Sequence, residues 1–563
     1  MTLIQYILHC LKKNGCHYIV GVPGTSCAAV YFAVEKDPEM SCVVTVNELE
    51  AGYIADGYGR FAGMGAVAVS YGVGSLSMIN AIASAYTEKV PMIILNGGPT
   101  AGEQADQDQY GILFSHSTGQ RHSDLEAFKN VTVAAAIIDD MSQAQQVVSD
   151  LFRQAKQISG PVYLEVANNR WNTEINIDEE EEIAQEAAIS AELVAAFHKK
   201  ISAASNPVLV LGSELSRRRL EGLAEEFVDR FKIPFVTTLL SKSLLDERHP
   251  LFIGTYDSDL VNKPPRRYAE SSDCLIALGC IFGIDHGTLV KSQYDNMIDV
   301  SYGKARIGTT KYSEDVSLER FLQAVLSIPR AAKLRSEQEA SLLKDKLQRE
   351  KSDRPSHDTV FKTINKFISD KGDKVMMVAD TCLSSYPAAD LDMPSTRMFL
   401  ANPVWLSIGQ GTPASVGAYL ATGKRPIIVT GDGGFQMIAQ TFSTMVKYRI
   451  PAIIAVIDNG IYGIEQFLLD KTFYTEPGKP PIGFNLLNRW KYENFPDVFG
   501  GGKGFRMNDT RKVYEVLEES FKYTDGPVII AVEVDIRDIP TEYVKYIEED
   551  KSGDHYDILQ QER

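Results

Sequence analysis

Residues 427–463 read IIVTGDGGFQMIAQTFSTMVKYRIPAIIAVIDNGIYG, and the pattern of this stretch indicates the fold class of the chain around it. Two apolar runs, 427–430 and 452–457, are each followed at once by a polar cluster that contains glycine. Continuously apolar runs of this length are typical of parallel strands that helices cover on both faces. Because parallel strands end at one edge of an open sheet, we expect the two polar clusters to lie together where such sheets bind ligands.

Short apolar runs of the same kind alternate with helical stretches along all 563 residues. They occupy 43–46, 66–70, 91–96, 207–211, 275–279, 374–378, 427–430, 452–457 and 527–534. This alternation predicts an α/β protein whose parallel sheets are flanked by helices. Two charged stretches, around 178–182 and from 330 to 356, are typical of linkers. Residues 546–563 are typical of a polar tail. The predicted domains are therefore 1–180, 190–340 and 355–563, each of a usual size for one domain.

The composition narrows the class of protein. Lys and Arg number 57 against 74 Asp and Glu, so the net charge of −17 disfavours nucleic acid as a general partner. No run of 18 apolar residues occurs, and no basic leader precedes the first apolar residues, so we expect no membrane span and no signal peptide. Seven cysteines without a CxxC pair indicate reduced thiols, and together these features favour a cytoplasmic protein.

The two polar clusters carry residue types that suit a phosphate and a magnesium ion. Gly431 and Gly433 let the backbone approach a ligand closely, with N–H groups available for phosphate oxygens. Asp432 and Asn459 supply the hard oxygen ligands that Mg²⁺ prefers. A Gly-Asp-Gly turn alone also occurs in ordinary strand-to-helix connections. Its pairing with Asp458-Asn459 after 24 intervening residues, each cluster following a strand, favours the ligand site.

This pair of clusters resembles the diphosphate-and-metal motif of thiamin diphosphate enzymes. The resemblance implies that Asp432, Asn459 and the main-chain carbonyl of Ile461 hold Mg²⁺. Many members of that family have Asn at the position of Asp458, but the metal ligand is matched by the next residue. The further residues that the resemblance implies for cofactor binding in this domain are Gly431, Gly433, Gly434 and Tyr462.

Residues 44–60, VTVNELEAGYIADGYGR, resemble the segment of the same family that carries the activating glutamate, which matches Glu48. A carboxylate hydrogen-bonded to N1′ of the aminopyrimidine favours the tautomer that removes the C2 proton of the cofactor, and a buried carboxyl suits this role. In this family the cofactor lies between the first domain of one subunit and the third domain of another. The resemblance therefore implies a homodimer or homotetramer.

Other segments are similar to the pyruvate, indolepyruvate and branched-chain 2-oxo-acid decarboxylases. They are residues 70–91 and 404–409, and the second implies that Ile408 is the apolar wedge beneath the cofactor. Gly72-x-Gly74 lacks the third glycine of a dinucleotide fingerprint, so we expect no nicotinamide. Plausible walls of a substrate pocket are Val404, Trp405, Gln466 and Leu469.

Two substrate-facing positions depart from the decarboxylases. Glu465 matches the family glutamate that assists decarboxylation, and Gly24 lies in the first Pro-Gly turn, near the cofactor in the family. However, Thr25 stands where an Asp is expected, and Ser115 replaces the first residue of a His pair, leaving only His116. Hydroxyl groups are poor acids near neutral pH, so the protonation that releases an aldehyde would be slower.

The resemblance thus implies thiamin diphosphate- and Mg²⁺-dependent, non-oxidative decarboxylation of a small-molecule 2-oxo acid to an aldehyde and CO₂. The alternative is a carboligase, in which the same intermediate attacks a second carbonyl and forms an acyloin. A catalytically silent scaffold and an FAD-containing relative are further possibilities. The presence of Glu48, Asp432 and Asn459 argues against the scaffold.

Overall fold

The computed structural model describes the chain except residues 178–188, 259–262, 314–315, 328–352, 382 and 550–563. The two stretches predicted to be linkers and the predicted tail fall largely outside the described residues, as does Cys382. The chain forms two compact units. The first comprises the described residues of Met1–Gln185, Pro413–Gly423 and Ser443–Tyr448, and the second comprises the rest.

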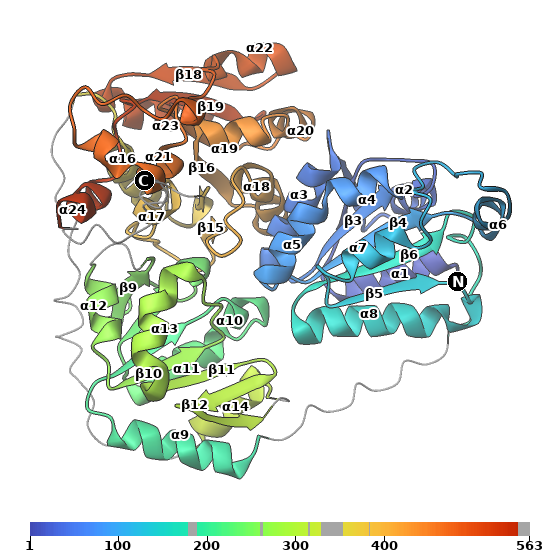
Figure 1. Cartoon of the computed structure of the whole chain (residues 1–563), viewed down its shortest axis with the longest axis horizontal. Coiled ribbons are helices and arrows are strands. Elements are labelled where there is room, and N and C mark those ends of the chain that lie inside the picture. The colour runs from blue at the N-terminus through green and yellow to red at the C-terminus, as the bar shows by residue number, and fades with distance from the viewer. Residues whose placement is uncertain (178–188, 259–262, 314–315, 328–352, 382, 550–563) are drawn as a thin grey trace, which may run out of the picture. The chain divides into compact units, whose positions relative to one another are not determined.

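The first sheet has six parallel strands in the order β2-β1-β3-β4-β6-β5. Its strands are β1 (Tyr18–Gly21), β2 (Ser41–Val44), β3 (Gly65–Ser70), β4 (Met92–Gly98), β5 (Ala134–Ile138) and β6 (Pro161–Ala167). The helices are α1 (Leu3–Lys13), α2 (Ala28–Lys36), α3 (Glu48–Ala62), α4 (Val73–Ser77), α5 (Ile79–Thr87), α6 (Ala101–Tyr110), α7 (Ser123–Phe128) and α8 (Ala144–Ile158). Residues of α1, α2 and α8 share one core cluster with the strands, and Figure 1 shows α3 and α5 on the side of the sheet away from α8. This double cover explains why the strand sequences are continuously apolar.

The central sheet has seven strands in the order β13-β12-β11-β10-β7-β8-β9. They are β7 (Pro207–Leu211), β8 (Phe235–Thr238), β9 (Phe252–Tyr256), β10 (Cys274–Leu278), β11 (Met297–Ser301), β12 (Lys304–Ile307) and β13 (Thr310–Ser313). The helices are α9 (Ala191–Ala203), α10 (Glu214–Arg217), α11 (Glu221–Phe231), α12 (Pro264–Glu270), α13 (Gly287–Gln293) and α14 (Leu318–Leu326). Strands β12 and β13 run antiparallel at one edge, because β11 and β12 are joined by a tight turn rather than by a helix. The other five strands are parallel.

The third sheet has six parallel strands in the order β15-β14-β16-β17-β19-β18. They are β14 (Val375–Ala379), β15 (Phe399–Ala401), β16 (Arg425–Gly431), β17 (Ile453–Asp458), β18 (Lys503–Met507) and β19 (Val528–Glu533). The helices are α16 (His357–Lys371), α17 (Ser385–Ala388), α18 (Gly411–Thr422), α19 (Asp432–Met437), α20 (Thr441–Lys447), α21 (Gly463–Leu469), α22 (Phe495–Phe499), α23 (Thr510–Lys522) and α24 (Thr541–Glu549). Counted along the chain, the strand order is the same as in the first sheet.

The predicted α/β architecture with three sheets flanked by helices is confirmed. Each of the nine predicted strands overlaps a strand of the structure, with ends that differ by one or two residues at most positions. The exact domain boundaries stay a prediction. Six cysteines lie within the described residues, and all six are free thiols. No helix in the described ranges is long and apolar enough to cross a membrane.

Candidate functional site

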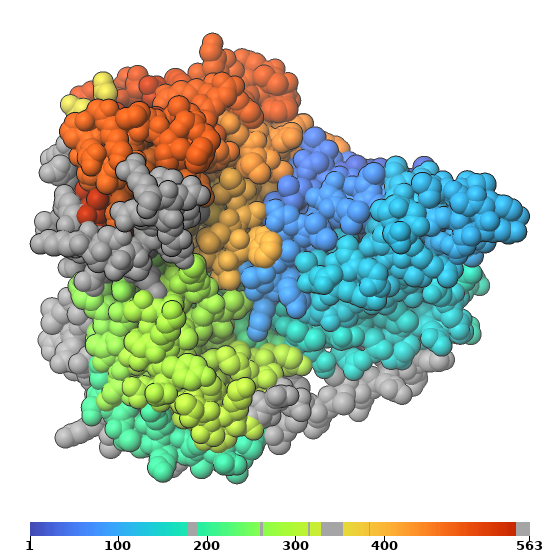
Figure 2. All heavy atoms as spheres, viewed as in Figure 1, coloured from blue at the N-terminus to red at the C-terminus, as the bar shows by residue number. Residues whose placement is uncertain are grey.

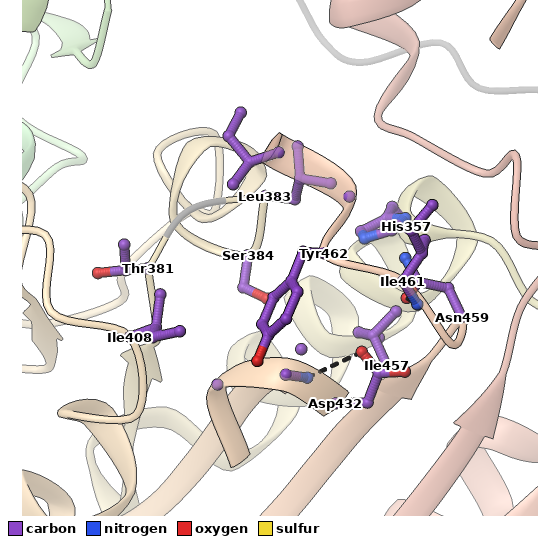
Figure 3. Close-up of a pocket in the computed structure, with 15 residues that line it drawn as sticks. His357, Thr381, Leu383, Ser384, Ile408, Asp432, Ile457, Asn459, Ile461 and Tyr462 are labelled. Carbon is purple, nitrogen blue, oxygen red and sulfur yellow. Dashed lines mark hydrogen bonds between the residues drawn. The ribbon is translucent and has the colours of Figure 1, made fainter. Parts of the chain in front are cut away.

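A pocket opens at the carboxyl edge of the third sheet, and the two glycine-rich clusters of the sequence line it together (Figure 3). The register of the parallel strands explains this meeting, because Gly431 at the end of β16 pairs with Ile457 near the end of β17. All eight residues that the resemblance assigned to the cofactor in this domain line the pocket. They are Ile408, Gly431, Asp432, Gly433, Gly434, Asn459, Ile461 and Tyr462.

Asp432 is the anionic centre of this pocket. Its side chain is buried, with 2% of the residue exposed, and burial raises the pKa of the carboxyl to about 6. The carboxylate accepts hydrogen bonds from the backbone N–H of Gly433 at 2.9 Å and of Gly460 at 2.6 Å. The second bond ties the turn after β16 to the turn after β17, so the two ligand-bearing clusters are fixed to each other.

The oxygen atoms of this pocket fit a divalent cation. Asp432 contributes a carboxylate, Asn459 an amide oxygen and Ile461 a main-chain carbonyl, and all three residues line the same pocket. Hard oxygen ligands of mixed kind are what Mg²⁺ takes in proteins. Among the described residues no three His, Cys, Asp or Glu side chains cluster as a metal site. A metal in this pocket would therefore depend on the amide and carbonyl oxygens as well as on Asp432.

Asp458 departs from the residue common in the resembling family, and the structure shows how its charge is accommodated. The side chain is buried, yet Arg506 on β18 lies 3.1 Å from its carboxylate. Burial raises the pKa of Asp458, while Arg489 and Arg506 lower it. Arg489 also donates a hydrogen bond to the main-chain oxygen of Asn459 at 3.0 Å. Two guanidinium groups thus offset the additional carboxylate behind the pocket.

Other residues proposed from the sequence lie outside the pocket wall. Glu465 is exposed in the first turn of α21, whose first residue, Gly463, does line the pocket. Gln466 is buried, and its side chain accepts a hydrogen bond from the backbone N–H of Ile482 at 2.9 Å. It therefore holds the loop that contains Ile482 in place. The four residues suggested as substrate walls, Val404, Trp405, Gln466 and Leu469, are not among those that line this pocket.

In the first unit, the predicted residues gather around the turn that follows β3. A Cβ atom on Gly24 would come within 1.9 Å of the Ser70 hydroxyl, so the Pro-Gly turn carrying Thr25 packs directly on this strand end. A Cβ on Gly72 would lie 2.3 Å from the main-chain oxygen of His116. Gly74 lies in the same turn, where a Cβ would be 3.3 Å from the carboxylate of Glu48. Ordinary side chains would therefore not fit at the first two positions.

The local sequence explains where Glu48 lies. Asn47 caps α3 by accepting a hydrogen bond from the N–H of Glu50, so Glu48 is the first residue of the helix, four residues after the end of β2. Glu48 is half-buried, whereas Thr25, Ser115 and His116 are exposed. His116 adopts a φ of 70°, a backbone conformation that is uncommon for residues other than glycine.

A buried polar network behind this turn was not predicted from the sequence. The Asp124 carboxylate accepts hydrogen bonds from the N–H of Gly72 at 2.8 Å, from Asn96 at 3.0 Å and from the hydroxyl of Ser75. Tyr163 contacts Asn96 at 2.6 Å and donates to Glu165 at 2.7 Å. Five polar side chains from distant parts of the chain meet here, and no spacing in the sequence links them.

His357, Thr381 and Ser384 also line the pocket without having been predicted. His357 is buried at the start of α16, and its Nδ1 lies 2.7 Å from the carboxylate of Asp538. In the sequence it looks like an ordinary first residue of a helix, since Ser356 before it is a helix cap. Only the folded chain reveals its place in the pocket wall.

Comparison with known proteins agrees with this geometry. Three family models of thiamine pyrophosphate enzymes match this chain. The model of the N-terminal TPP binding domain matches residues 1–125, that of the central domain matches 194–327, and that of the C-terminal TPP binding domain matches 381–532. The chain belongs to the thiamine pyrophosphate enzymes. Thiamine pyrophosphate is another name for thiamin diphosphate, and the pocket described above lies within the third match.

Several curated relatives of this thiamine pyrophosphate enzyme match over nearly the full length. Pyruvate decarboxylase 1 of Pisum sativum is 29% identical over 547 residues, which cover 93% of this chain and 88% of the relative. Indole-3-pyruvate decarboxylase of Azospirillum brasilense is 26% identical, covering 92% and 93% of the two chains. Pyruvate decarboxylase of Aspergillus fumigatus is 26% identical, covering 95% and 94%.

Proposed function

We propose that this thiamine pyrophosphate enzyme uses Mg²⁺ to decarboxylate a 2-oxo acid, releasing CO₂ and an aldehyde. The observation that carries the proposal is the pocket in which Asp432, Asn459 and Ile461 offer oxygen ligands opposite the apolar side chain of Ile408 (Figure 3). The relatives named as decarboxylases support the reaction class.

In this proposal, Asp432, the Asn459 amide and the Ile461 carbonyl hold Mg²⁺. The backbone of the turn from Gly431 to Gly434 would bind the diphosphate, with Tyr462 in the same part of the pocket wall, and Ile408 would offer an apolar contact to the rings of the cofactor. When bound, thiamin diphosphate supplies a carbon nucleophile and an electron sink for the departing CO₂. The protein contributes the orientation of the bound groups, exclusion of water and the proton transfers.

Glu48 holds the proton that activates the cofactor. We propose that its carboxyl hydrogen-bonds N1′ of the aminopyrimidine, while Gly24 contacts the same ring. The position of Glu48 supports this role, because it is half-buried and a Cβ atom on Gly74 would lie 3.3 Å from its carboxylate.

His116 and Glu465 move protons to and from the substrate carbon, with Thr25 and Ser115 as hydrogen-bond donors. The last two residues favour a second candidate, a carboligase that forms an acyloin. A hydroxyl donates a hydrogen bond but does not release its proton readily near neutral pH. Slow protonation leaves time for attack on a second carbonyl, so both products are consistent with the same residues.

The active assembly in this proposal is a homodimer or a homotetramer. The end of α6 and the residues after it support a contact with a second copy, because the large hydrophobic side chains of Tyr110, Ile112 and Leu113 are each about 60% exposed. Figure 2 shows α6 and its neighbours at the protruding end of the first domain, in light blue. Clustered apolar exposure of this kind is typical of an interaction surface.

The test is release of CO₂ from a panel of aliphatic, branched and aromatic 2-oxo acids, with and without thiamin diphosphate and Mg²⁺. We expect release that needs both additions and that is lost in the Glu48→Gln variant. Product analysis then separates an aldehyde from an acyloin. Absence of release from every acid, with the cofactor shown to be bound, would contradict the proposed reaction.

A further inference from the structure

Asp380 is a buried carboxylate directly behind the wall of the cofactor pocket. It follows β14 at once, and its neighbour Thr381 lines the pocket. Only 1% of Asp380 is exposed. Within the described part of the chain it forms no ion pair with Lys, Arg or His. Burying a charge without a cation is costly, so a side chain of this kind calls for an explanation.

Hydrogen bonds from four donors compensate for that burial. One carboxylate oxygen accepts from the backbone N–H groups of Thr381 at 3.0 Å, Gly409 at 3.2 Å and Gly411 at 3.4 Å. The other accepts from the hydroxyl of Thr430 at 2.7 Å and also from Gly409 at 3.1 Å. An asparagine could not replace it, because its amide nitrogen would face at least one of these donors.

The donors belong to three separate segments, and the Asp380 carboxylate accepts hydrogen bonds from all of them. Thr381 follows β14, Gly409 lies in the loop between β15 and α18, Gly411 is the first residue of α18, and Thr430 lies near the end of β16. The loop between β15 and α18 also contains Leu406 at a φ of 59°, a strained conformation that the surrounding contacts must maintain. Three residues after that strained position, the N–H of Gly409 donates to the Asp380 carboxylate, and the N–H of Gly411 follows it.

These segments form two facing parts of the pocket. Ile408 directly precedes Gly409, and the turn from Gly431 to Gly434 follows Thr430. A Cβ on Gly434 would lie 2.8 Å from the Asp380 carboxylate, and one on Gly409 would lie 2.7 Å from the main-chain oxygen of Gly434. Figure 3 shows Ile408 beside Thr381, with Asp432 and Asn459 on the other side of the pocket.

We propose that Asp380 is a positioning residue that sets the spacing between Ile408 and the turn from Gly431 to Gly434. Through this spacing, it fixes how the two rings of the cofactor are oriented while the diphosphate is held. The inference rests on the proposed function in one respect only, namely that thiamin diphosphate binds with its rings against Ile408. It predicts that loss of the Asp380 carboxylate impairs activation of the cofactor more than binding of the cofactor.

The experiment compares wild type with Asp380→Asn after loading both with Mg²⁺ and thiamin diphosphate. Calorimetry gives the cofactor affinity, and quenched-flow NMR gives the rate at which the C2 proton of the bound cofactor exchanges with deuterium. We expect the affinity to change by less than about fivefold and the exchange rate to fall by about tenfold or more, with kcat falling in parallel and KM unchanged. A purely structural role would move affinity and thermal stability but not this exchange rate alone.

Two further variants keep the test decisive. Thr430→Val removes one donor without changing the shape of the side chain, and we expect about a threefold slower exchange. Asp299→Asn alters a buried carboxyl of the central domain, whose partner is Lys304, and should leave exchange as in wild type. If Asp380→Asn does not fold, Thr430→Val still decides. Wild-type exchange in Thr430→Val, or in a folded Asp380→Asn, would overturn the inference.

The outcome separates this inference from the proposed reaction, because C2 exchange needs no substrate. Fast exchange in wild type, slow exchange in Asp380→Asn and no CO₂ from any 2-oxo acid would uphold the role of Asp380 and contradict the decarboxylation. Equal exchange rates in both proteins, with normal CO₂ release in wild type, would contradict the role of Asp380 and support the decarboxylation. A wild-type protein that binds no thiamin diphosphate would contradict both.

Discussion

The first and third sheets share one strand order, but the sites at their carboxyl edges differ in exposure. In the first domain, Thr25 after β1, Glu48 at the start of α3 and His116 in the loop between α6 and α7 are exposed or half-buried. In the third sheet, the edge encloses a pocket in which Asp432 and Asn459 are at most 5% exposed. We propose that the same scaffold supports an open edge for proton transfer and a closed edge for a metal and a diphosphate.

Corresponding loops show where the difference arises. After the second strand, the first sheet has Glu48 at the start of α3 and the third sheet has Ile408 in the loop before α18, so one edge presents a carboxyl where the other presents an apolar side chain. The loop after the third strand is fixed by a buried carboxylate in both sheets, Asp124 under Gly72 and Asp380 behind Gly434. Function is set by the loops, while the buried carboxylates fix the backbone that carries them.

The largest effect is expected from Glu48→Gln, which removes the carboxyl from the open edge. We expect kcat to fall by about a thousandfold, because general acid–base groups contribute on the order of 10²–10⁴ in rate. Cofactor affinity, measured by calorimetry, should stay within a few-fold of wild type, since the closed edge is intact. Glu126→Gln, an exposed carboxyl of the same domain that pairs with Lys129, is the control and should retain full activity. Comparable turnover in Glu48→Gln would remove the basis for assigning proton transfer to this edge.

The complementary change is Asp432→Ala at the closed edge. We expect the Mg²⁺-dependent affinity for thiamin diphosphate to fall by about a hundredfold or more, because the proposed metal ligand and its hydrogen bond from Gly460 are lost together. Titration calorimetry with and without Mg²⁺ measures this loss. Asp458→Asn is the matched control, since its charge is offset by Arg506 rather than used for the metal, and it should bind within a few-fold of wild type. Unchanged affinity in Asp432→Ala would show that the metal binds elsewhere.

The two edges also differ in how much of them the sequence predicts. Eight of the residues that line the pocket at the closed edge were proposed from the sequence, because all of them except Ile408 lie in two short clusters that directly follow strands, whereas His357, Thr381 and Ser384 were missed. At the open edge, the family resemblance predicted Glu48 and His116 but not the network of Asp124, Asn96 and Tyr163. Those three residues are brought together only by folding, since 28 and 39 residues separate them along the chain. Asp380 was missed for the same reason: its donors come from three segments that no local pattern connects.

A change in stability rather than activity is expected at Glu165, the end of the network behind the open edge. Burial raises the pKa of this carboxyl from 4.5 to about 7. The hydrogen bond from Tyr163 lowers the pKa, and the charges of Asp124 and Asp139 raise it by smaller amounts. The folded state therefore keeps a proton that the unfolded state loses between pH 4.5 and 7. Stability falls over that window as pH rises, and above pH 7 the cost amounts to about 3 kcal/mol.

Glu165→Gln tests this by replacing the protonated carboxyl with a neutral group of the same shape. Denaturant unfolding of both proteins between pH 4.5 and 8 should show the variant more stable by about 3 kcal/mol at pH 8. The difference should shrink to nearly zero at pH 4.5, which provides an internal control. A constant difference across the range would mean that Glu165 does not titrate in this window.

The smallest expected effect comes from restoring the acids that the open edge lacks, with Thr25→Asp and Ser115→His in one variant. An imidazole titrates near pH 6.5 and so can donate a proton where a serine hydroxyl cannot. Faster protonation should raise the ratio of aldehyde to acyloin, by about threefold to tenfold, with total CO₂ release little changed. Chromatography of the products from a single 2-oxo acid measures the ratio. Thr118→His places an imidazole at an exposed position three residues after Ser115 and should leave the ratio as in wild type. An unchanged ratio in the double variant would mean that His116 and Glu465 already provide the protons this edge needs.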